Sequence, residues 1–473
     1  MDSIKTDICV IGAGSAGLSV AAGAAQLGRK TVLVERDEMG GDCLNTGCVP
    51  SKALLAAGAV AQSMRDAAPF GIAAEAPRID GAAIHAHVRD TIATIAPNDS
   101  QARFEGLGVT VIRAHAQFVD DRTVEAGGKR IRARRFVIAT GSRAVLPSLP
   151  GLDQIDVFTN ETIFKKDFIP KHLLVIGGGP LGLELAQAHR RLGAAVTVIE
   201  AAAILPRDDE EAAAVVRDAL TDEGVRIIEQ TRVTALTRSA DGVQAHILTP
   251  HGSDVFSASH VLVAVGRKPS VEGLGLERAG IAWDAKGIAV DHRMKTSNRR
   301  VYAIGDVAGG PQFTHVANYH AGLVIRNALF RLPVRAGYSH IPHVTYTDPE
   351  LAQVGLTEVQ ARAADPAVKT VRAELAENDR AITERRTRGF AKLIVDRRGR
   401  IRGATIVGAH AGELILPWAL AISEKTKLSR IAAITAPYPT LSEVSKRAAG
   451  TYFTAALFGG RTRALVRLLS WFG

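Results

Sequence analysis

The sequence predicts an α/β fold with two Rossmann-like units, because one pattern of strand, glycine turn, helix, strand and acidic residue occurs twice. In the first copy, an apolar strand at 7–11 precedes Gly12-x-Gly14-x-x-Gly17 and an alanine-rich helix. The next strand, at 31–34, ends in Glu35. This order of elements is typical of a dinucleotide-binding βαβ unit.

The second copy begins with an apolar strand at 173–176. The glycine motif Gly177-x-Gly179-x-x-Gly182, a helix and a strand that ends in Glu200 follow it. In both copies the glutamate follows the first glycine by 23 positions. One glycine motif alone is weak evidence, whereas two copies with every element in register are strong evidence.

Each motif has a physical reason. The glycines allow a tight turn, close approach of a pyrophosphate, and close packing of helix on strand. The helix N-terminus then faces the phosphates, and the glutamate accepts hydrogen bonds from ribose hydroxyls. The alternative for Glu35 and Glu200 is an ordinary charged strand end. We expect the chain to bind two dinucleotides.

A cysteine pair follows the first copy. Cys43 and Cys48 are two of only three cysteines in the chain. Residues five apart in an ideal helix lie roughly 8–9 Å apart at Cα, too far for a disulfide, so the segment must be distorted. Asn45 and Gly47 supply backbone freedom for that distortion. A strained, accessible disulfide is redox-active, and the alternative is two ordinary buried thiols. Cys9, within the first strand, is expected to be a small core residue.

Composition limits the function classes. The chain has 473 residues, 47% hydrophobic and 22% charged, with a net charge of +10. Three cysteines favour a reducing compartment over a secreted disulfide framework, and the start lacks the order of a signal peptide, so we expect a cytoplasmic protein. No apolar run predicts a membrane span. The basic residues are scattered, which favours a solvated surface over nucleic-acid binding.

The position of the cysteines assigns the cofactors. A flavin can relay electrons between a nicotinamide and a thiol pair, so FAD is predicted at the first site and NAD(H) at the second. Glu200 would repel a 2′-phosphate, and residues 201–203 are alanines that cannot bind one. NADH is therefore expected in preference to NADPH.

Several motifs together resemble the class I flavoprotein disulfide reductases, which include dihydrolipoamide dehydrogenase, glutathione reductase and mercuric reductase. The resemblance covers essentially the whole chain. It is carried by the redox stretch, two domain-crossover motifs, a second FAD contact and the start of an interface domain, at residues 40–52, 139–141, 264–269, 301–306 and 345–355.

The resemblance implies four segments, of which the last is an α+β dimerisation domain. The FAD domain is expected at 1–147 and 272–340, the NAD domain at 148–271, and the dimerisation domain at 341–473. It also implies a homodimer, because family members complete each active site with residues of the partner subunit.

Roles follow by the same resemblance. Cys48 is similar to the flavin-proximal thiol and Cys43 to the interchange thiol that attacks the substrate. Lys52 and Glu184 match a pair near the flavin, where Lys52 stabilises negative charge on the reduced ring. His315 is a flavin neighbour or a structural helix-start histidine, and His320 is expected to be structural. The remaining expected FAD contacts are Thr140, Gly141 and Asp306, and Gly266 is the remaining expected NAD contact.

One departure concerns the catalytic base. Where disulfide-reducing members carry an acid–base histidine, this chain has Tyr438, within a retained frame that includes Glu443. A phenol of pKa near 10 is a poor base, so dihydrolipoamide turnover should be impaired. Mercuric reductases also place a tyrosine near this point, but this chain lacks their C-terminal cysteine pair. Pro180 and Glu200 argue against glutathione reductase. No metal-ligand spacing is present, so no resident metal is expected.

The functional prediction is an enzyme that moves electrons between NAD(H) and a dithiol or disulfide substrate, most like dihydrolipoamide dehydrogenase. The alternatives are a mercuric-reductase-like metal or quinone reductase, and a membrane-associated redox sensor or electron carrier without small-substrate turnover. Residues 461–473 read as a short basic amphipathic helix. It either lies on the inner face of an anionic membrane or packs on the dimer.

Overall fold

The computed structural model describes residues 2–240 and 242–472 and divides into two compact units. Unit 1 comprises Met1–Gly177, Ala188–Ile199 and Thr231–Gly337. Unit 2 comprises Gly178–Gln187, Glu200–Gln230 and Tyr338–Gly473. The predicted α/β class, with two Rossmann-like folds and a C-terminal α+β domain, is confirmed.

The first Rossmann-like fold is built on a sheet of order β3-β2-β1-β6-β5-β4, with β18 beside β6. β1, β2, β3, β6 and β18 run parallel, whereas β5 runs antiparallel to its two neighbours, β6 and β4. The bounds are β1 Ser3–Ile11, β2 Thr31–Glu35, β3 Val109–Arg113, β4 Ala116–Phe118, β5 Thr123–Ala126, β6 Lys129–Ile138 and β18 Val301–Ala303. The strand order reverses at β1, so the carboxyl ends of β1, β2 and β6 meet where such sheets bind ligands.

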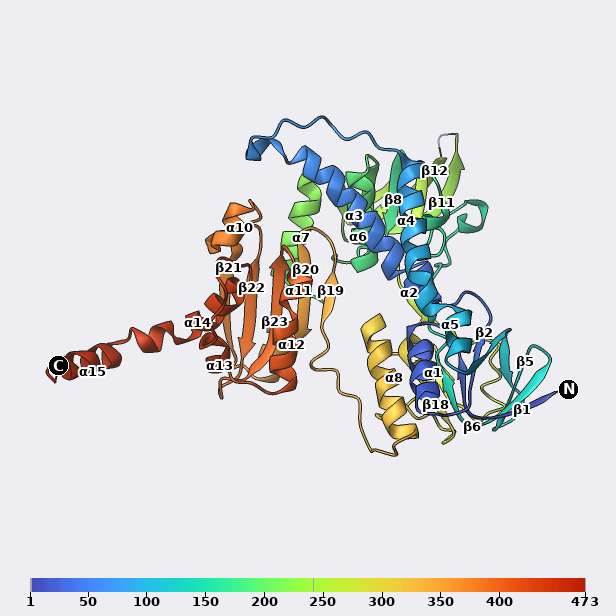
Figure 1. The fold of residues 1–473 in the computed structure, drawn as a ribbon. Helices are drawn as coiled ribbons and strands as arrows, with labels where there is room; N and C mark the ends of the chain where they lie inside the picture. The colour runs from blue at the N-terminus through green and yellow to red at the C-terminus, as the bar shows by residue number, and fades with distance from the viewer. Residues whose placement is uncertain (1, 241, 473) are drawn as a thin grey trace. The chain divides into compact units, whose positions relative to one another are not determined.

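Helices cover this sheet. α1 packs against α8 (Figure 1). Small or branched apolar side chains fill their contact with the sheet. α3 packs against α4, whose N-cap Asp80 accepts a hydrogen bond from the Ala83 N–H. The helices of this region are α1 Ser15–Gln26, α2 Gly41–Asn45, α3 Cys48–Arg65, α4 Gly81–Ile95, α5 Gln101–Gly106 and α8 Thr314–Ala328.

The second Rossmann-like fold repeats the parallel arrangement. β8 lies between β9 and β14 and is parallel to both. An antiparallel sheet β11-β12-β13 follows, and β7 pairs with β15. The bounds are α6 Pro180–Arg191, β7 Ser142–Ala144, β8 His172–Ile176, β9 Ala195–Ile199, β11 Arg232–Ser239, β12 Gly242–Thr249, β13 Gly252–Ala258, β14 His260–Val263, β15 Arg267–Pro269, β16 Trp283–Asp284 and β17 Gly287–Ile288.

Unit 2 is organised around the antiparallel sheet β19-β20-β23-β22-β21. α12 and α14 contact this sheet and bury Trp418, Val444 and Ala448 against Leu393 and Ile406. The bounds are α7 Glu210–Asp222, β10 Val225–Ile228, β19 His343–Thr345, β20 Glu350–Gly355, α9 Glu358–Ala364, β21 Lys369–Glu374, α10 Asp379–Thr383, β22 Phe390–Val395, β23 Ile401–Gly408, α11 Ala411–Leu414, α12 Leu416–Ser423, α13 Leu428–Ala432, α14 Glu443–Leu457 and α15 Gly460–Leu469.

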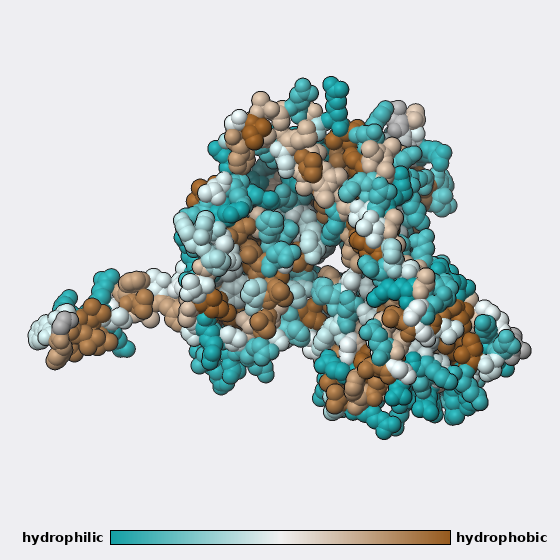
Figure 2. Space-filling model, viewed as in Figure 1, coloured by the Kyte–Doolittle hydropathy of each residue, from teal (hydrophilic) through white to brown (hydrophobic). Residues whose placement is uncertain are grey.

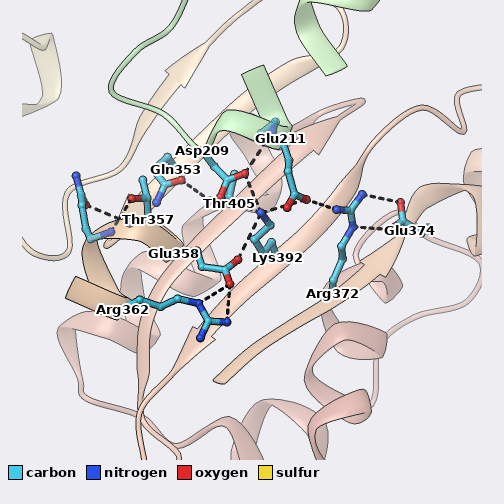
Figure 3. A network of polar contacts seen from close by, with 12 residues as sticks. Asp209, Glu211, Gln353, Thr357, Glu358, Arg362, Arg372, Glu374, Lys392 and Thr405 are labelled. Carbon is cyan, nitrogen blue, oxygen red and sulfur yellow. Dashed lines mark hydrogen bonds and ion pairs between the residues drawn. The ribbon is translucent and has the colours of Figure 1, made fainter. Parts of the chain in front are cut away.

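A buried ion pair joins the segment Glu200–Gln230 to this sheet (Figure 3). The Lys392 Nζ, on β22, lies 2.9 Å from Asp209 Oδ1 and 3.0 Å from Oδ2, and both side chains are about 95% buried, with exposures of 4% and 5%. Asp209 also caps α7 by accepting from the Ala212 N–H. Glu211 and Glu358 lie 3.2 and 3.8 Å from the same ammonium. One lysine therefore neutralises a carboxylate that fixes the start of α7.

Removing this ammonium should destabilise the protein strongly. Lys392→Met keeps an apolar stem of similar length but leaves the buried Asp209 carboxylate without its cation, which typically costs about 3–5 kcal/mol. The melting temperature of the FAD-loaded enzyme should fall, as measured by differential scanning fluorimetry. The double variant Lys392→Met, Asp209→Asn removes both buried charges and should recover much of the loss. A Lys392→Met protein that melts with the wild type would contradict this role.

Candidate active site

The two glycine motifs are built alike. Gly12 and Gly177 have φ of +104° and +114°, a region that favours glycine. A Cβ on Gly12 would lie 2.4 Å from the Ala139 carbonyl oxygen, and one on Gly177 would lie 2.5 Å from that of Ala264. Ala139 and Ala264 open the two crossover motifs, so each crossover motif packs on the first glycine of its own Rossmann-like fold.

The glutamates bond to their glycine loops in the same way. Glu35 accepts from the Ala13 N–H at 2.6 Å and from the Asp37 N–H at 2.7 Å. In the second copy, Glu200 accepts from the Gly178 N–H at 2.6 Å and from the Ala202 N–H at 2.9 Å. Each carboxylate is thereby fixed beside the glycine turn. Because a carboxylate has about four acceptor positions, each keeps capacity for a ribose hydroxyl.

The first loop fits the FAD that the motif implies. α1 begins after Gly14, whose extended backbone brings no capping side chain to the first turn. The backbone N–H groups there can bind a pyrophosphate. A Cβ on Gly17 would lie 1.8 Å from the Gly12 carbonyl oxygen, so only glycine permits this turn.

The redox stretch is held against the same loop. A Cβ on Gly41 would lie 2.7 Å from the Gly14 Cα, and the Gly40 N–H donates to the Ala13 carbonyl at 2.9 Å. Gly40 and Gly41 both have positive φ, at +88° and +61°. This backbone contact places the segment with both cysteines next to the expected pyrophosphate site.

The helical distortion expected between the cysteines is present. α2 ends at Asn45 and α3 begins at Cys48, so the two thiols lie on different helices. The Asn45 Nδ2 closes the turn by donating to the carbonyls of Met39 and Gly41. Gly47 is the N-cap of α3, and its φ of −125° shows that the left-handed turns lie earlier, at Gly40 and Gly41.

The two thiols differ in acidity. Both are free and hydrogen-bonded to each other, and the Cys48 Sγ lies 3.4 Å from the Thr314 Oγ1. The hydrogen bond from Cys43, with help from Thr314 and the Lys52 charge, lowers the pKa of Cys48 to about 6. The same bond and burial raise the pKa of Cys43. Cys48 and Thr314 begin α3 and α8, so two helix N-termini face the thiolate.

Other expected FAD contacts lie in unit 1. Asp306, in the 3-10 turn Gly305–Ala308, accepts from the Ser142 hydroxyl at 2.6 Å, and burial raises the pKa of Asp306. The Arg267 Nε donates to the same hydroxyl at 2.8 Å. The Thr140 hydroxyl donates to the Ser270 carbonyl at 2.8 Å. Arg267 and Ser270 thus connect the two crossover strands near Asp306.

The glycines of the crossover motifs both have positive φ. Gly141 and Gly266 have φ of +66° and +131°, and each follows its alanine by two residues. Gly179 and Gly182 lie around the start of α6, as the second motif predicts. Lys52 is half-buried on α3 in unit 1. Glu184, on α6 in unit 2, is buried and accepts from the Tyr346 N–H at 2.9 Å.

The histidines near the thiols differ from each other. His315 is exposed on the first turn of α8, where its ring stacks on Phe313 with centroids 5.2 Å apart. His320 is buried, and its Nδ1 accepts from the Gly305 N–H at 3.3 Å. Burial lowers the pKa of His320 to about 4. His320 is therefore a neutral packing residue beside the turn that carries Asp306.

Tyr438 lies in unit 2 on the rim of a pocket of about 330 Å³ that Asn378, Glu443 and Lys446 also line. It is 70% exposed, and its hydroxyl donates to the Asp379 Oδ2 at 2.7 Å. Asp379 raises the pKa of Tyr438 further. Glu443, the first residue of α14, accepts from the Thr440 N–H at 3.4 Å. The phenol therefore stays protonated at neutral pH and cannot accept a proton.

Sequence reasoning missed two side chains here. Thr314 contacts the Cys48 sulfur, and Asp379 binds the Tyr438 hydroxyl. Thr314 stands next to His315, a candidate flavin neighbour by the resemblance, so the Thr314 hydroxyl could have been predicted to lie near the thiols. Asp379 lies 59 residues before Tyr438, and no local pattern links them. Within the described ranges, no cluster of three or more His, Cys, Asp or Glu residues could hold a metal ion.

Two models of one protein family match this chain. The family model for pyridine nucleotide-disulphide oxidoreductases matches residues 6–321, and the model for the dimerisation domain of the same family matches residues 341–449. The mercuric reductase of Streptomyces lividans is 36% identical over 454 residues, 94% of this chain and 96% of that protein. The dihydrolipoyl dehydrogenase of Thermus scotoductus is 39% identical over 450 residues, 92% and 95% of the two chains.

Solved structures agree with the sequence relatives. The Cu(II) complex of the HOCl-induced flavoprotein disulfide reductase RclA from Escherichia coli has a TM-score of 0.85 at 26% identity, covering 94% of this chain and 99% of that one. LpdA from Mycobacterium tuberculosis has a TM-score of 0.86 at 28% identity, with the same coverage. The names of these proteins include both metal-related and dithiol-related activities.

The asymmetry of the two thiols can be tested by alkylation of the reduced enzyme. The reaction of Cys48 with iodoacetamide should be half-maximal near pH 6 and slow below it, because the thiolate is lost as pH falls through its pKa. Cys43→Ala removes the main hydrogen bond, so the midpoint should rise toward that of an ordinary thiol. Cys43→Ser keeps a donor and should shift less. Equal midpoints in all three proteins would contradict the assignment; Cys9 is fully buried and should not react.

Proposed function

Since the chain belongs to the pyridine nucleotide-disulphide oxidoreductase family, whose members use FAD and NAD(P)H, we propose that it passes electrons from NADH to a soft metal ion held by Cys43 and Cys48. The observation that carries this proposal concerns Tyr438, which stands where the acid–base histidine is expected. Its hydroxyl donates a hydrogen bond to Asp379, so no side chain at this position can act as a base. Reduction of a thiolate-bound metal ion needs no such base.

The thiol pair suits this substrate. Soft thiolate ligands favour soft metal ions, and two thiols without a third ligand fit a transient substrate better than a resident metal. Cys48 is ionised at neutral pH, and binding of the metal displaces the proton of Cys43. For a divalent ion, the balance is NADH and M²⁺ giving NAD⁺, H⁺ and M⁰. Bound FAD would accept hydride from the nicotinamide and return electrons one pair at a time.

The chain's own residues position the cofactors in this proposal. The Glu35 and Glu200 carboxylates would receive the two ribose hydroxyls, and the glycine turns would receive the pyrophosphates. Glu200 would also repel the 2′-phosphate of NADPH, which favours NADH. Lys52 and Glu184 would lie near the flavin, with Lys52 stabilising negative charge. The dimerisation domain supports a homodimer.

A second candidate is the oxidation of a dihydrolipoamide-type dithiol with NAD⁺ as acceptor. Its support is the likeness to the Thermus scotoductus dihydrolipoyl dehydrogenase and the retained Thr440–Glu443 frame around position 438. In this reaction a proton must leave the substrate thiol, and the phenol of Tyr438 is a poor acceptor for it.

Steady-state assays should separate the two candidates. Purified enzyme should oxidise NADH, in preference to NADPH, with Hg(II) in the presence of excess thiol, and turn over dihydrolipoamide slowly. Cys43→Ser should lose metal-dependent NADH oxidation while it retains FAD, because one of two ligands is lost. Fast dihydrolipoamide oxidation with no metal-dependent activity would overturn the proposal, as would full metal-dependent activity in Cys43→Ser.

Position 438 gives an independent test. Tyr438→His restores a base of suitable pKa, so dihydrolipoamide turnover should rise by about 10²-fold, at the lower end of what acid–base catalysis contributes. Tyr438→Phe is the matched control, because it removes the hydroxyl without adding a base, and it should leave the low rate unchanged. If Tyr438→His brings no gain, another group handles the proton.

A further inference from the structure

The C-terminal stretch after residue 443 is strongly cationic. Between residues 444 and 473 the sequence contains Lys446, Arg447, Arg461, Arg463 and Arg467, and no aspartate or glutamate. Within this stretch, Arg447 lies 3.1 Å from Glu377, which stands outside it. A one-signed segment of this kind suits an anionic surface.

The last helix separates its polar and apolar side chains. At 100° per residue, Leu465, Leu468 and Leu469 fall on one side of α15, and Arg463 and Arg467 fall on the opposite side. Arg461, in the first turn, falls on the same side as the leucines. Trp471 and Phe472 follow the end of the helix. This distribution is typical of helices that lie in the plane of a membrane surface, with aromatic side chains at the interface.

The apolar side of α15 is uncovered by its own chain. No residue of α15 is buried, and Leu465, Leu468 and Leu469 are all more than half exposed. Trp471 and Phe472 are 80% and 82% exposed. Figure 1 shows α15 running out beyond α14, and Figure 2 shows apolar side chains gathered along it between hydrophilic ones. Within residues 2–240 and 242–472, no helix is both long and apolar enough to cross a membrane.

The family's dimerisation domain does not account for this helix. That match ends at residue 449, whereas α15 begins at Gly460. α15 therefore lies outside the segment that matches the dimerisation domain. The charge of the stretch also disfavours a second copy of itself as partner, because two such helices would repel each other.

We propose that α15 and the residues to Phe472 bind in the plane of an anionic lipid surface and hold the enzyme there. The leucines, Trp471 and Phe472 enter the boundary between headgroups and acyl chains. Arg463 and Arg467 remain among the headgroup phosphates, and Lys446 adds to the attraction. Neither the thiol pair nor the two dinucleotide sites take part in this contact.

Vesicle binding of the full FAD-loaded protein tests the proposal. Co-sedimentation should be strong with vesicles that mix phosphatidylglycerol and phosphatidylcholine, and weak with phosphatidylcholine alone. Arg461→Gln, Arg463→Gln, Arg467→Gln together should weaken binding about a hundredfold, since each arginine near an anionic surface contributes about fivefold. The matched control replaces Arg134, Arg397 and Arg398, three exposed arginines elsewhere, with glutamine and should bind normally.

A truncation after Gly459 separates the alternatives. It should lose vesicle binding but keep NADH-dependent flavin reduction and the same mass by light scattering. Trp471 fluorescence should shift to shorter wavelength on anionic vesicles, and Trp471→Phe should abolish the shift. The proposal fails if the full chain ignores anionic vesicles or the truncated chain still binds them. It also fails if truncation converts a dimer to a monomer, which would make α15 a subunit contact.

Discussion

The contact between the Gly14 and Gly41 backbones is the constraint on which the candidate site depends. A side chain on Gly41 would clash with the Gly14 backbone, so the redox segment lies directly on the loop expected to bind the pyrophosphate. From there, the break between α2 and α3 places Cys48 at a helix N-terminus and Cys43 beside it. The glycine at position 41 thus sets how closely the thiol segment approaches the expected site of the first dinucleotide.

The sequence was sufficient for the parts of the site that repeat or cluster locally. Both glycine motifs, Glu35 and Glu200 lie where the strand pattern predicts, and they form matching hydrogen bonds. Partners distant in the chain were not predictable, because nothing local marks them. Asp209 and Lys392 are 183 residues apart, and Cys48 and Thr314 are 266 apart. Their pairing depends on how whole elements pack.

The acidities of the two thiols and the hydrogen bond of Tyr438 together limit which reactions the thiol pair can carry out. The site ionises one thiol and suppresses ionisation of the other, because a shared proton lies between them. In relatives that exchange dithiols, a separate base must remove protons as the reaction proceeds. Here Asp379 accepts a hydrogen bond from the Tyr438 hydroxyl, so in the proposed reaction the metal ion would itself displace the proton from Cys43. A metal ion, as a Lewis acid, does this directly.

Because α15 is short, binding of the enzyme to a lipid surface would depend on whether it is a dimer. A single ten-residue amphipathic helix is a weak, rapidly reversible anchor. A homodimer carries two, and once one has bound, the other meets the same bilayer at a high effective concentration. The time that the dimer stays on the bilayer would then depend on the product of the two weak helix affinities, provided that both helices reach the same surface. Dilution or a weakened dimer interface would release the enzyme without altering any residue that touches lipid.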